Sequence, residues 1–272
     1  MAGDLDPRLH PFRDDLAASS LKGRVEAKRF VDATSYQVCV PVLDVIAKPD
    51  ATGLATQMLF GEVFDVYEEA GALAWGQCRA DGYVGYARKA GLGEPKPATD
   101  RIDALSAHVY AAPNFKSLPV MSLSMGSLVE VTGAKGDFLS TPDGYVSQKH
   151  VGGGSADFVE VAEQVLGAPY LWGGRSAFGL DCSALVQLAL MAVGKTCPRD
   201  SDMQMRDLGR VVDGPYERGD LVFWKGHVGI MCDATTLLHA NIHHMRVAFE
   251  PIADAVARIA KTDGPVLAHK RL

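Results

Sequence analysis

The sequence lacks several features that mark particular classes of protein. Its 272 residues contain five cysteines, an odd number, and no Cys-x-x-Cys pair, which argues against a disulfide framework and a zinc cage. It has 27 basic and 33 acidic residues, and no basic block that could displace counterions from a nucleic acid. Its longest apolar run, residues 184–193, is about half the length needed to span a bilayer and includes Gln187. We therefore expect neither a nucleic-acid partner nor a membrane partner.

The N-terminus also lacks a targeting pattern. Residues 1–15 do not show the charged, then apolar, then small-residue order of a secretory signal. The composition, 47% hydrophobic and 22% charged, is typical of a folded soluble protein, and the length predicts about two domains. Together these features predict a cytoplasmic protein with free thiols.

The first half of the chain has the texture of small β-structures. Residues 1–33 are predicted to form an arm, with a short helix within residues 17–30. Beyond them, residues 36–42, 63–67 and 73–78 alternate apolar with polar or small residues, which predicts short strands.

A weak internal repeat divides this half into two copies. Residues 60–67, Phe-Gly-Glu-Val-Phe-Asp-Val-Tyr, resemble residues 125–131, Met-Gly-Ser-Leu-Val-Glu-Val, and Asp-Gly-Tyr-Val occurs at both 81–84 and 143–146. An Asp-Gly turn followed by a returning strand suits a small five-stranded barrel. We predict one barrel over residues 34–92, a linker, and a second barrel over residues 100–151.

The second half changes to helical periodicity. Residues 158–166 show an amphipathic pattern, with Ser155 or Asp157 available to cap the helix and Gly167 after it. A glycine-rich loop follows, and then residues 181–193 form a helix that is apolar on every face and therefore buried. Residues 221–224, 227–231 and 236–240 are strand candidates. This order predicts an α+β domain over residues 154–272.

Cys182 is the residue whose position points most directly to chemistry. It follows the glycine-rich loop and opens the buried helix, where unpaired N–H groups and the helix dipole favour a thiolate. Asp181 acts in the opposite sense, so a nearby cation is needed, for which His227 and His239 are candidates. A single cysteine in an apolar stretch is most often core filling, and Cys39, Cys78 and Cys232 fit that interpretation.

Six short motifs in order distinguish Cys182 from the other cysteines. They are Gly-Ala-Pro-Tyr-Leu-Trp-Gly-Gly from 167, Gly-Leu-Asp-Cys-Ser-Ala-Leu-Val from 179, Pro-Arg-Asp-Ser from 198, Gly-Asp-Leu-Val-Phe-Trp from 219, His-Val-Gly-Ile from 227 and Leu-His-Ala from 238. This series resembles the NlpC-type cysteine peptidases, bacterial enzymes that cut cell-wall peptides. The resemblance implies a papain-like α+β core.

The resemblance also implies catalytic roles. It makes Cys182 the nucleophile, His227 the base and His239 the third, orienting member, with Tyr170 beside the nucleophile and able to help form an oxyanion hole. No metal and no organic cofactor are expected. A zinc site that uses the His239-x-x-x-His243 spacing is a remote alternative, because the sequence offers no carboxylate set to complete it.

The two predicted barrels are similar to the paired bacterial SH3-like domains of one subgroup of this family. These are the dipeptidyl-peptidase VI-like γ-D-glutamyl-L-diamino acid endopeptidases, which act on small murein peptides with a free N-terminal L-Ala. The resemblance implies that Asp181 pairs with the substrate ammonium. Further candidates for substrate binding are Ser183, Ser201, Glu62 and either Tyr83 or Tyr86, while Arg199 meets a substrate carboxylate or forms a surface salt bridge.

The function expected from the resemblance is cleavage between γ-D-Glu and a diamino acid, in the recycling of cell-wall peptides. The diamino acid, meso-diaminopimelate or L-Lys, stays open. Two alternatives also stay open: a non-catalytic protein that binds murein fragments, and an amidase or endopeptidase that acts on the intact wall.

Overall fold

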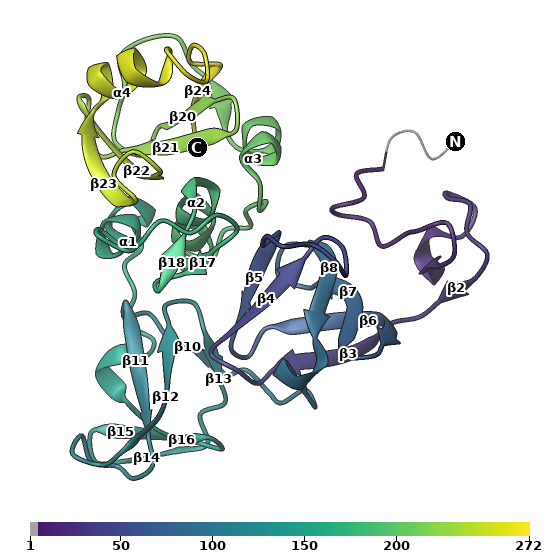
Figure 1. The fold of residues 1–272 in the computed structure, drawn as a ribbon. Coiled ribbons are helices and arrows are strands. Elements are labelled where there is room, and N and C mark those ends of the chain that lie inside the picture. The colour runs from purple at the N-terminus through teal and green to yellow at the C-terminus, as the bar shows by residue number, and fades with distance from the viewer. Residues whose placement is uncertain (1–4) are drawn as a thin grey trace. The chain divides into compact units, whose positions relative to one another are not determined.

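A computed structural model describes residues 5–272 of the chain. It divides into two compact units, shown in Figure 1. One unit contains the residues up to 102 together with 107–150, and the other contains residues 103–106 and 151–272. The first four residues of the predicted arm lie outside the described residues.

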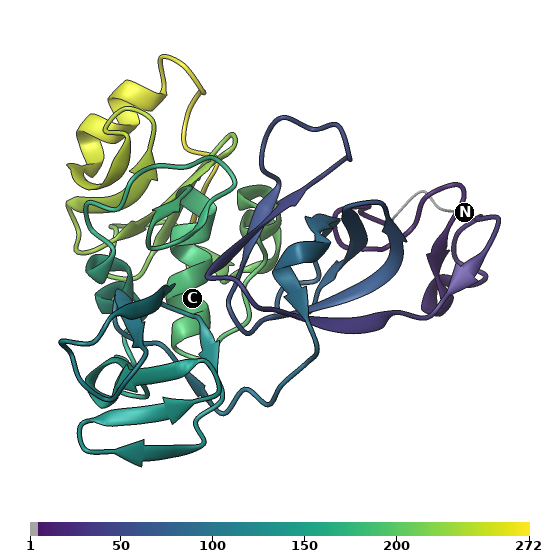
Figure 2. The same cartoon turned by 60° about the horizontal axis from the view of Figure 1, so that its bottom comes forward.

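The N-terminal unit is built almost entirely of short strands (Figure 2). Those of the arm and the first barrel are β1 (Ala17–Ala18), β2 (Phe30–Val31), β3 (Thr34–Val38), β4 (Val42–Ile46), β5 (Thr56–Leu59), β6 (Val63–Ala70), β7 (Leu73–Cys78), β8 (Val84–Arg88) and β9 (Leu92–Gly93). Those of the second barrel are β10 (Asp100–Arg101), β11 (Ser106–Tyr110), β12 (Pro119–Ser124), β13 (Leu128–Val129), β14 (Gly133–Lys135), β15 (Phe138–Thr141) and β16 (Gly144–Ser147). Single 3-10 turns occur at η1 (Ser19–Leu21), η2 (Lys89–Gly91) and η3 (Gln148–His150).

The helix expected within residues 17–30 is wrong. β1 and β2 pair in parallel there, and η1 is the only helical turn in that stretch. Gly23 has a φ of +82°, which right-handed helix does not allow. The apolar residues of the arm instead form a cluster of their own, made of Ala17, Ala18, Leu21 and Val25.

The first barrel follows the sequence pattern closely. Its seven strands are ordered β5-β4-β8-β7-β6-β3-β9. β7 has the predicted bounds, and the predicted Asp81-Gly82 turn leads into β8. The expected strand over residues 36–42 is wrong at its end, because the chain leaves one strand at Val38 and begins another at Val42, on the two sides of Pro41. Proline has no N–H to donate to a neighbouring strand.

The internal repeat corresponds to a repeated local structure. Gly61 and Gly126 have φ values of +84° and +89°, and their N–H groups donate to Val38 and Ile102 respectively. The second copy forms the sheet β12-β11-β16-β15-β14, with β10 paired to β13. The N–H of Leu128 donates to the Phe60 carbonyl at 2.8 Å and so joins the two copies.

In the C-terminal unit, a buried helix packs against a six-stranded sheet ordered β19-β24-β20-β21-β22-β23. The helices are α1 (Phe158–Gln164), α2 (Cys182–Ala192), α3 (Ser201–Asp207) and α4 (Ile252–Ile259). The strands are β17 (Arg175–Ser176), β18 (Gly179–Leu180), β19 (Arg210–Val211), β20 (Leu221–Trp224), β21 (His227–Met231), β22 (Thr236–Asn241), β23 (Arg246–Pro251) and β24 (Ala268–Arg271).

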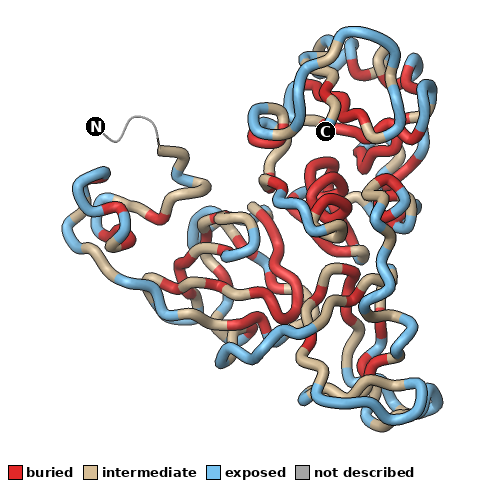
Figure 3. Tube along the Cα trace, turned by 180° about the vertical axis from the view of Figure 1, so that it is seen from behind, coloured by how far each residue is buried: buried red, intermediate tan, exposed pale blue. Residues whose placement is uncertain are grey.

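The helix α2 is the core of this unit. Residues 182–190 are all buried, as Figure 3 shows, and the helix packs against α1, β21 and β22. The predicted buried helix and the three predicted strands are therefore confirmed. Asp157 caps α1 by accepting the Val159 N–H at 2.8 Å. None of the helices among residues 5–272 is both long enough and apolar enough to cross a bilayer.

Candidate active site

The thiol of Cys182 lies at the start of α2, against the start of β21. Its Sγ is 3.9 Å from the Gly226 carbonyl oxygen, and the Val228 N–H also points to the sulfur. These two backbone groups flank His227 in the sequence. The close packing of α2 on β21 therefore brings the predicted nucleophile and the predicted base to one place.

The two predicted histidines are hydrogen-bonded to each other. His227 Nε2 and His239 Nδ1 are 2.9 Å apart, and they come from the adjacent strands β21 and β22. Gly229 explains why the His-Val-Gly motif needs its glycine. A Cβ at this position would lie 2.7 Å from Leu237 Cδ1 and 3.2 Å from His239 Cβ, so a side chain there would force Leu237 to move and would crowd the histidine.

A carboxylate that the sequence analysis did not identify completes the row of side chains. Glu250 Oε2 on β23 is 3.0 Å from His239 Nε2, and the Glu250 carboxylate also accepts hydrogen bonds from Arg258 on α4. Glu250 is buried in β23, a strand whose other residues after Arg246 are apolar, and a single carboxylate in such a run was the one signal the sequence offered. Neither residue belongs to the six motifs.

Burial favours the neutral forms of both predicted catalytic groups. It raises the pKa of Cys182 to about 12, with a further contribution from the Asp181 charge, and it lowers the pKa of His227 to about 3. The expectation that the helix start would produce a low thiol pKa is wrong, because the loss of solvent outweighs the helix dipole. Each charge is costly alone in this dry site, so proton transfer from Cys182 to His227 creates both charges together.

Arg199 is the cation that pairs with Asp181, while the expectation that His227 or His239 balances the thiolate charge stays a prediction. The guanidinium makes two parallel hydrogen bonds to the carboxylate, at 2.9 and 2.8 Å, and the Arg199 side chain is 1% exposed. This corrects both expectations for Arg199, since a buried, paired guanidinium is neither a surface salt bridge nor available to a substrate carboxylate.

Asp181 is the centre of a buried polar network. Besides Arg199, it accepts from the N–H groups of Gly173 and Ala184 and from the Ser183 hydroxyl, at 2.9 to 3.1 Å. It is thus the N-cap of α2 and anchors the glycine-rich loop. Its acceptor positions are occupied by the protein, which does not support a direct pairing of Asp181 or Ser183 with a substrate ammonium.

Tyr170 and Ser201 lie in the same unit. Burial, together with the charges of Cys182 and Asp181, raises the pKa of Tyr170, so its hydroxyl keeps its proton and can donate to an oxyanion. Ser201 is the first residue of α3 and is half-buried. Its contact with a substrate stays a prediction.

The remaining candidates belong to the N-terminal unit. The Glu62 carboxylate is buried and accepts from the Leu59 N–H at 2.9 Å, which gives it a local role in a turn. Tyr83 is buried, and the Tyr86 hydroxyl accepts from Arg13 at 2.9 Å. That any of these three residues binds substrate stays a prediction.

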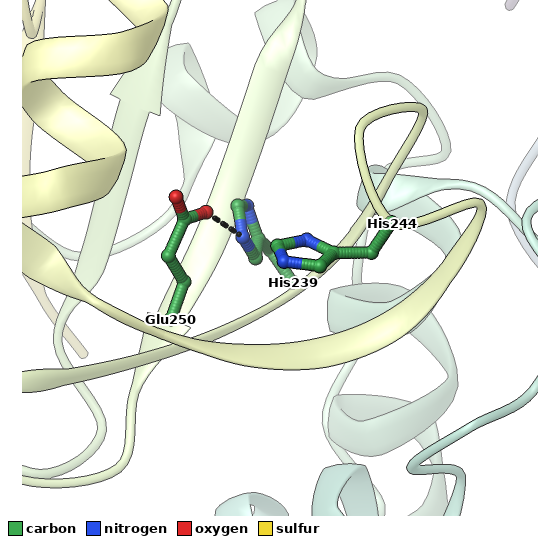
Figure 4. Close-up of side chains that lie close together, drawn as sticks. All are labelled: His239, His244 and Glu250. Carbon is green, nitrogen blue, oxygen red and sulfur yellow. Dashed lines mark hydrogen bonds and ion pairs between the residues drawn. The ribbon is translucent and has the colours of Figure 1, made fainter.

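The groups that could hold a metal are His239, His244 and Glu250, whose ligand atoms lie within 4.8 Å of one another. Figure 4 shows His239 between the other two. The remote zinc alternative named His243, whereas His244 is the residue that points here. Because both Glu250 oxygens accept from Arg258 and one of them also faces His239, the cluster has the contacts of a hydrogen-bond relay.

Comparison with known proteins assigns this unit. The family model described as "NlpC/P60 family" matches residues 167–259, and the model described as "Bacterial dipeptidyl-peptidase Sh3 domain" matches residues 45–92. The C-terminal unit is an NlpC/P60 peptidase domain. Cys182, His227, His239 and Glu250 all lie within the matched residues.

Relatives from two bacilli carry the same name. A gamma-D-glutamyl-L-lysine dipeptidyl-peptidase from Bacillus subtilis is 29% identical over 213 residues, which cover 69% of this chain and 72% of the relative. One from Bacillus cereus is 34% identical over 90 residues, which cover 33% of this chain and only 24% of the relative.

A solved structure confirms the predicted fold class. The crystal structure of an NlpC/P60 family protein from Bacillus cereus superposes with a TM-score of 0.73, at 19% identity, over 88% of this chain and 99% of that one. At this identity the likeness establishes the fold alone. The chain therefore has an SH3-like N-terminal part followed by a papain-like NlpC/P60 domain.

Proposed function

We propose that the protein is a cysteine endopeptidase that cleaves the γ-D-Glu–diamino acid bond of small murein peptides with a free N-terminal L-Ala. The observation that carries the proposal is the placement of Cys182 beside the hydrogen-bonded pair His227 and His239. The Bacillus relatives named for γ-D-glutamyl-L-lysine peptides, and the matched SH3 domain, support this substrate class.

The chemistry proceeds through a thioester. His227 accepts the thiol proton as the sulfur attacks the γ-carbonyl carbon of D-Glu, and it then gives that proton to the departing amine of the diamino acid. Water next attacks the thioester, loses a proton to His227 and releases the L-Ala-D-Glu product with the restored Cys182 thiol. Tyr170 and the N–H groups at the start of α2 are the proposed donors to the oxyanion.

The proposed setting is the cytoplasm, where the substrates are murein peptides already taken up for recycling.

Product identification by mass spectrometry tests the proposal. L-Ala-γ-D-Glu-meso-diaminopimelate and L-Ala-γ-D-Glu-L-Lys are each incubated with the reduced protein, beside their N-acetylated forms, longer stem peptides and intact sacculi. We expect release of the free diamino acid from one or both unmodified tripeptides, and little from the acetylated ones. Cleavage of sacculi in preference to tripeptides would replace the proposal with a wall hydrolase.

Two matched cysteine variants assign the nucleophile. Cys182→Ala should abolish cleavage, whereas Cys232→Ala, at another buried cysteine, should leave it unchanged. Tripeptide binding without turnover by the wild type would instead indicate the non-catalytic alternative.

A further inference from the structure

Behind the proposed catalytic cysteine, four side chains form a continuous row across four elements. His227 on β21 meets His239 on β22, His239 meets Glu250 on β23, and Glu250 meets Arg258 on α4. The last contact is two-fold: Arg258 Nε lies 3.0 Å from Glu250 Oε1, and Arg258 Nη2 lies 2.6 Å from Glu250 Oε2. His239 is fully buried and Glu250 nearly so.

A hydrogen bond between two neutral histidines can run in either direction, and only one direction permits catalysis. If His239 Nδ1 carried the proton, it would donate to His227 Nε2, and the proton of His227 would then sit on Nδ1. His227 would have no lone pair left with which to take the thiol proton. If instead His227 Nε2 donates to His239 Nδ1, the Nδ1 of His227 is free to act as the base.

Glu250 selects the productive direction. Its carboxylate oxygen can only accept, so it requires a proton on His239 Nε2 at the 3.0 Å contact. With that proton on Nε2, the Nδ1 atom of a neutral His239 must accept from His227. The carboxylate thereby fixes a proton position two residues away from itself.

Because Arg258 balances its charge, the Glu250 carboxylate can fix the proton on His239 Nε2 without favouring the protonated form of His239. An unpaired carboxylate beside His239 would favour its protonated form, in which both ring nitrogens are donors. The groups that face His239 are His227, His244 from the β22–β23 hairpin, and Glu250 backed by Arg258. On His227, the charges of Asp263 and Glu250 both favour the protonated ring. The Arg258 charge opposes those of Glu250 and Asp263 at this site.

We propose that Glu250, held and neutralised by Arg258, is a positioning residue that sets the direction of the His227–His239 hydrogen bond and thereby makes His227 a base. The inference rests on the proposed function for its kinetic readout. It extends the catalytic row beyond the three motif residues to a strand and a helix that none of the six motifs covers.

Three variants separate the acceptor from the charge. Glu250→Gln keeps an oxygen that can accept from His239 and should retain kcat within roughly tenfold. The double variant Glu250→Leu/Arg258→Met removes acceptor and cation together, leaves no charge unpaired, and should lose roughly 100-fold in kcat with KM unchanged. Wild-type kcat in the folded double variant would overturn the proposal.

The pH profile of kcat/KM gives a readout that a merely structural role would not move. Arg258→Met leaves the Glu250 charge unopposed, so the acid limb should move up by about one pH unit. Glu250→Gln leaves the Arg258 charge unopposed, so that limb should move down. Arg218→Met is the matched control, because it removes an arginine that pairs with Asp157 and Glu163 elsewhere in the unit, and its profile should not move. An unmoved acid limb in both test variants would refute the assigned coupling of Glu250 and Arg258 to the two histidines.

Two measurements need no peptide substrate and so test the inference apart from the proposed function. Nitrogen-15 NMR of labelled histidines should show the proton on Nε2 in both His227 and His239 of the wild type, and a mixture of tautomers in the double variant. The alkylation rate of Cys182 by iodoacetamide should show the same acid-limb shifts as above. If no tripeptide is cleaved but both measurements behave in this way, the inference stands and the substrate assignment fails. A proton on Nδ1 of wild-type His239 would overturn the inference whatever the substrate.

Discussion

Removing the Arg199 guanidinium should destabilise the C-terminal unit more than the loss of any exposed ion pair. Arg199→Met keeps much of the side-chain volume but leaves the Asp181 carboxylate charged and unpaired in a site where Arg199 is 1% exposed. Two charge-assisted hydrogen bonds, at 2.9 and 2.8 Å, disappear, together with the contacts of Arg199 to Ser183 Oγ and the Gly174 carbonyl. Breaking a buried pair from one side typically costs about 3–5 kcal/mol.

The expected change in melting temperature follows from the size of the unit. Residues 151–272 make up nearly all of it, and roughly 120 residues at about 2.1 cal/mol/K each give an unfolding entropy near 250 cal/mol/K. Each kcal/mol then lowers Tm by about 4 °C, so Arg199→Met should melt roughly 12–20 °C below the wild type. Differential scanning calorimetry, with urea unfolding at 25 °C beside it, measures both quantities.

Two further variants make the reasoning refutable. Arg218→Met breaks half-exposed pairs and should cost no more than about 1 kcal/mol. Adding Asp181→Asn to Arg199→Met removes the stranded charge but keeps a side-chain oxygen to cap α2, so the double variant should recover about half of the lost stability. A loss below about 1 kcal/mol in Arg199→Met, or no recovery in the double variant, would show that Asp181 is not held charged by Arg199.

Three other predictions concern the acid-base groups and the barrels. Burial acts against the charge of Asp220, but hydrogen bonds from Arg271 and His269 outweigh it and lower the pKa of Asp220 to about 2 in the folded protein. The charged carboxylate therefore stabilises the fold by about 2 kcal/mol above pH 4, and this stabilisation is lost as the pH falls from 4 to 2. The free energy of urea unfolding should differ between Asp220→Asn and the wild type at pH 6 and should converge near pH 2. Because burial raises the pKa of Cys182, the wild-type thiol should react with iodoacetamide at pH 7 more slowly than the exposed Cys39, as site-resolved mass spectrometry will report. Gly61→Ala places a Cβ against the Leu128 carbonyl and also strains a φ of +84°. It should therefore lower the Tm of the N-terminal unit more than Gly71→Ala does, because Gly71 has a φ of +60° but open space around it. Equal Tm values for the two variants would mean that the contact between the two barrels contributes nothing to stability.

Periodicity predicted the elements of the catalytic unit because each depends on local pattern. The helix at residues 182–192 is apolar on every face, and the strands at 221–224 and 227–231 are short apolar runs with glycine or charge at their ends. The arm failed for the opposite reason. Its alanines suggest a helix, but the positive φ at Gly23 and the burial of Leu21 and Val25 in a cluster with Tyr67 are set by tertiary contacts.

The site could be predicted where a motif spans it and not where partners are distant in the sequence. Cys182 and His227 come from motifs, and the structure places the Cys182 sulfur against the backbone on either side of His227. The pairing of Arg199 with Asp181 joins residues 18 positions apart, and the same motif residues are compatible with a surface arginine. The role of Glu250 depends on the register that sets His239 opposite Ala248 and Leu237 opposite Glu250, which no local pattern specifies.

The buried Asp181–Arg199 pair and the Glu250–Arg258 pair, in which Arg258 is partly exposed, resolve the same electrostatic conflict at the two ends of the row. Asp181 caps the helix that begins with Cys182, yet its charge raises the pKa of the Cys182 thiol. Glu250 accepts the hydrogen bond that orients His239, yet its charge favours the protonated His239 ring. Each carboxylate is paired with an arginine that lowers the unwanted effect while leaving the hydrogen bond in place. Geometry and charge are therefore carried by different residues. Substituting an arginine should change the pH dependence first, whereas replacing a carboxylate by a side chain that cannot accept a hydrogen bond should change the arrangement of the site itself.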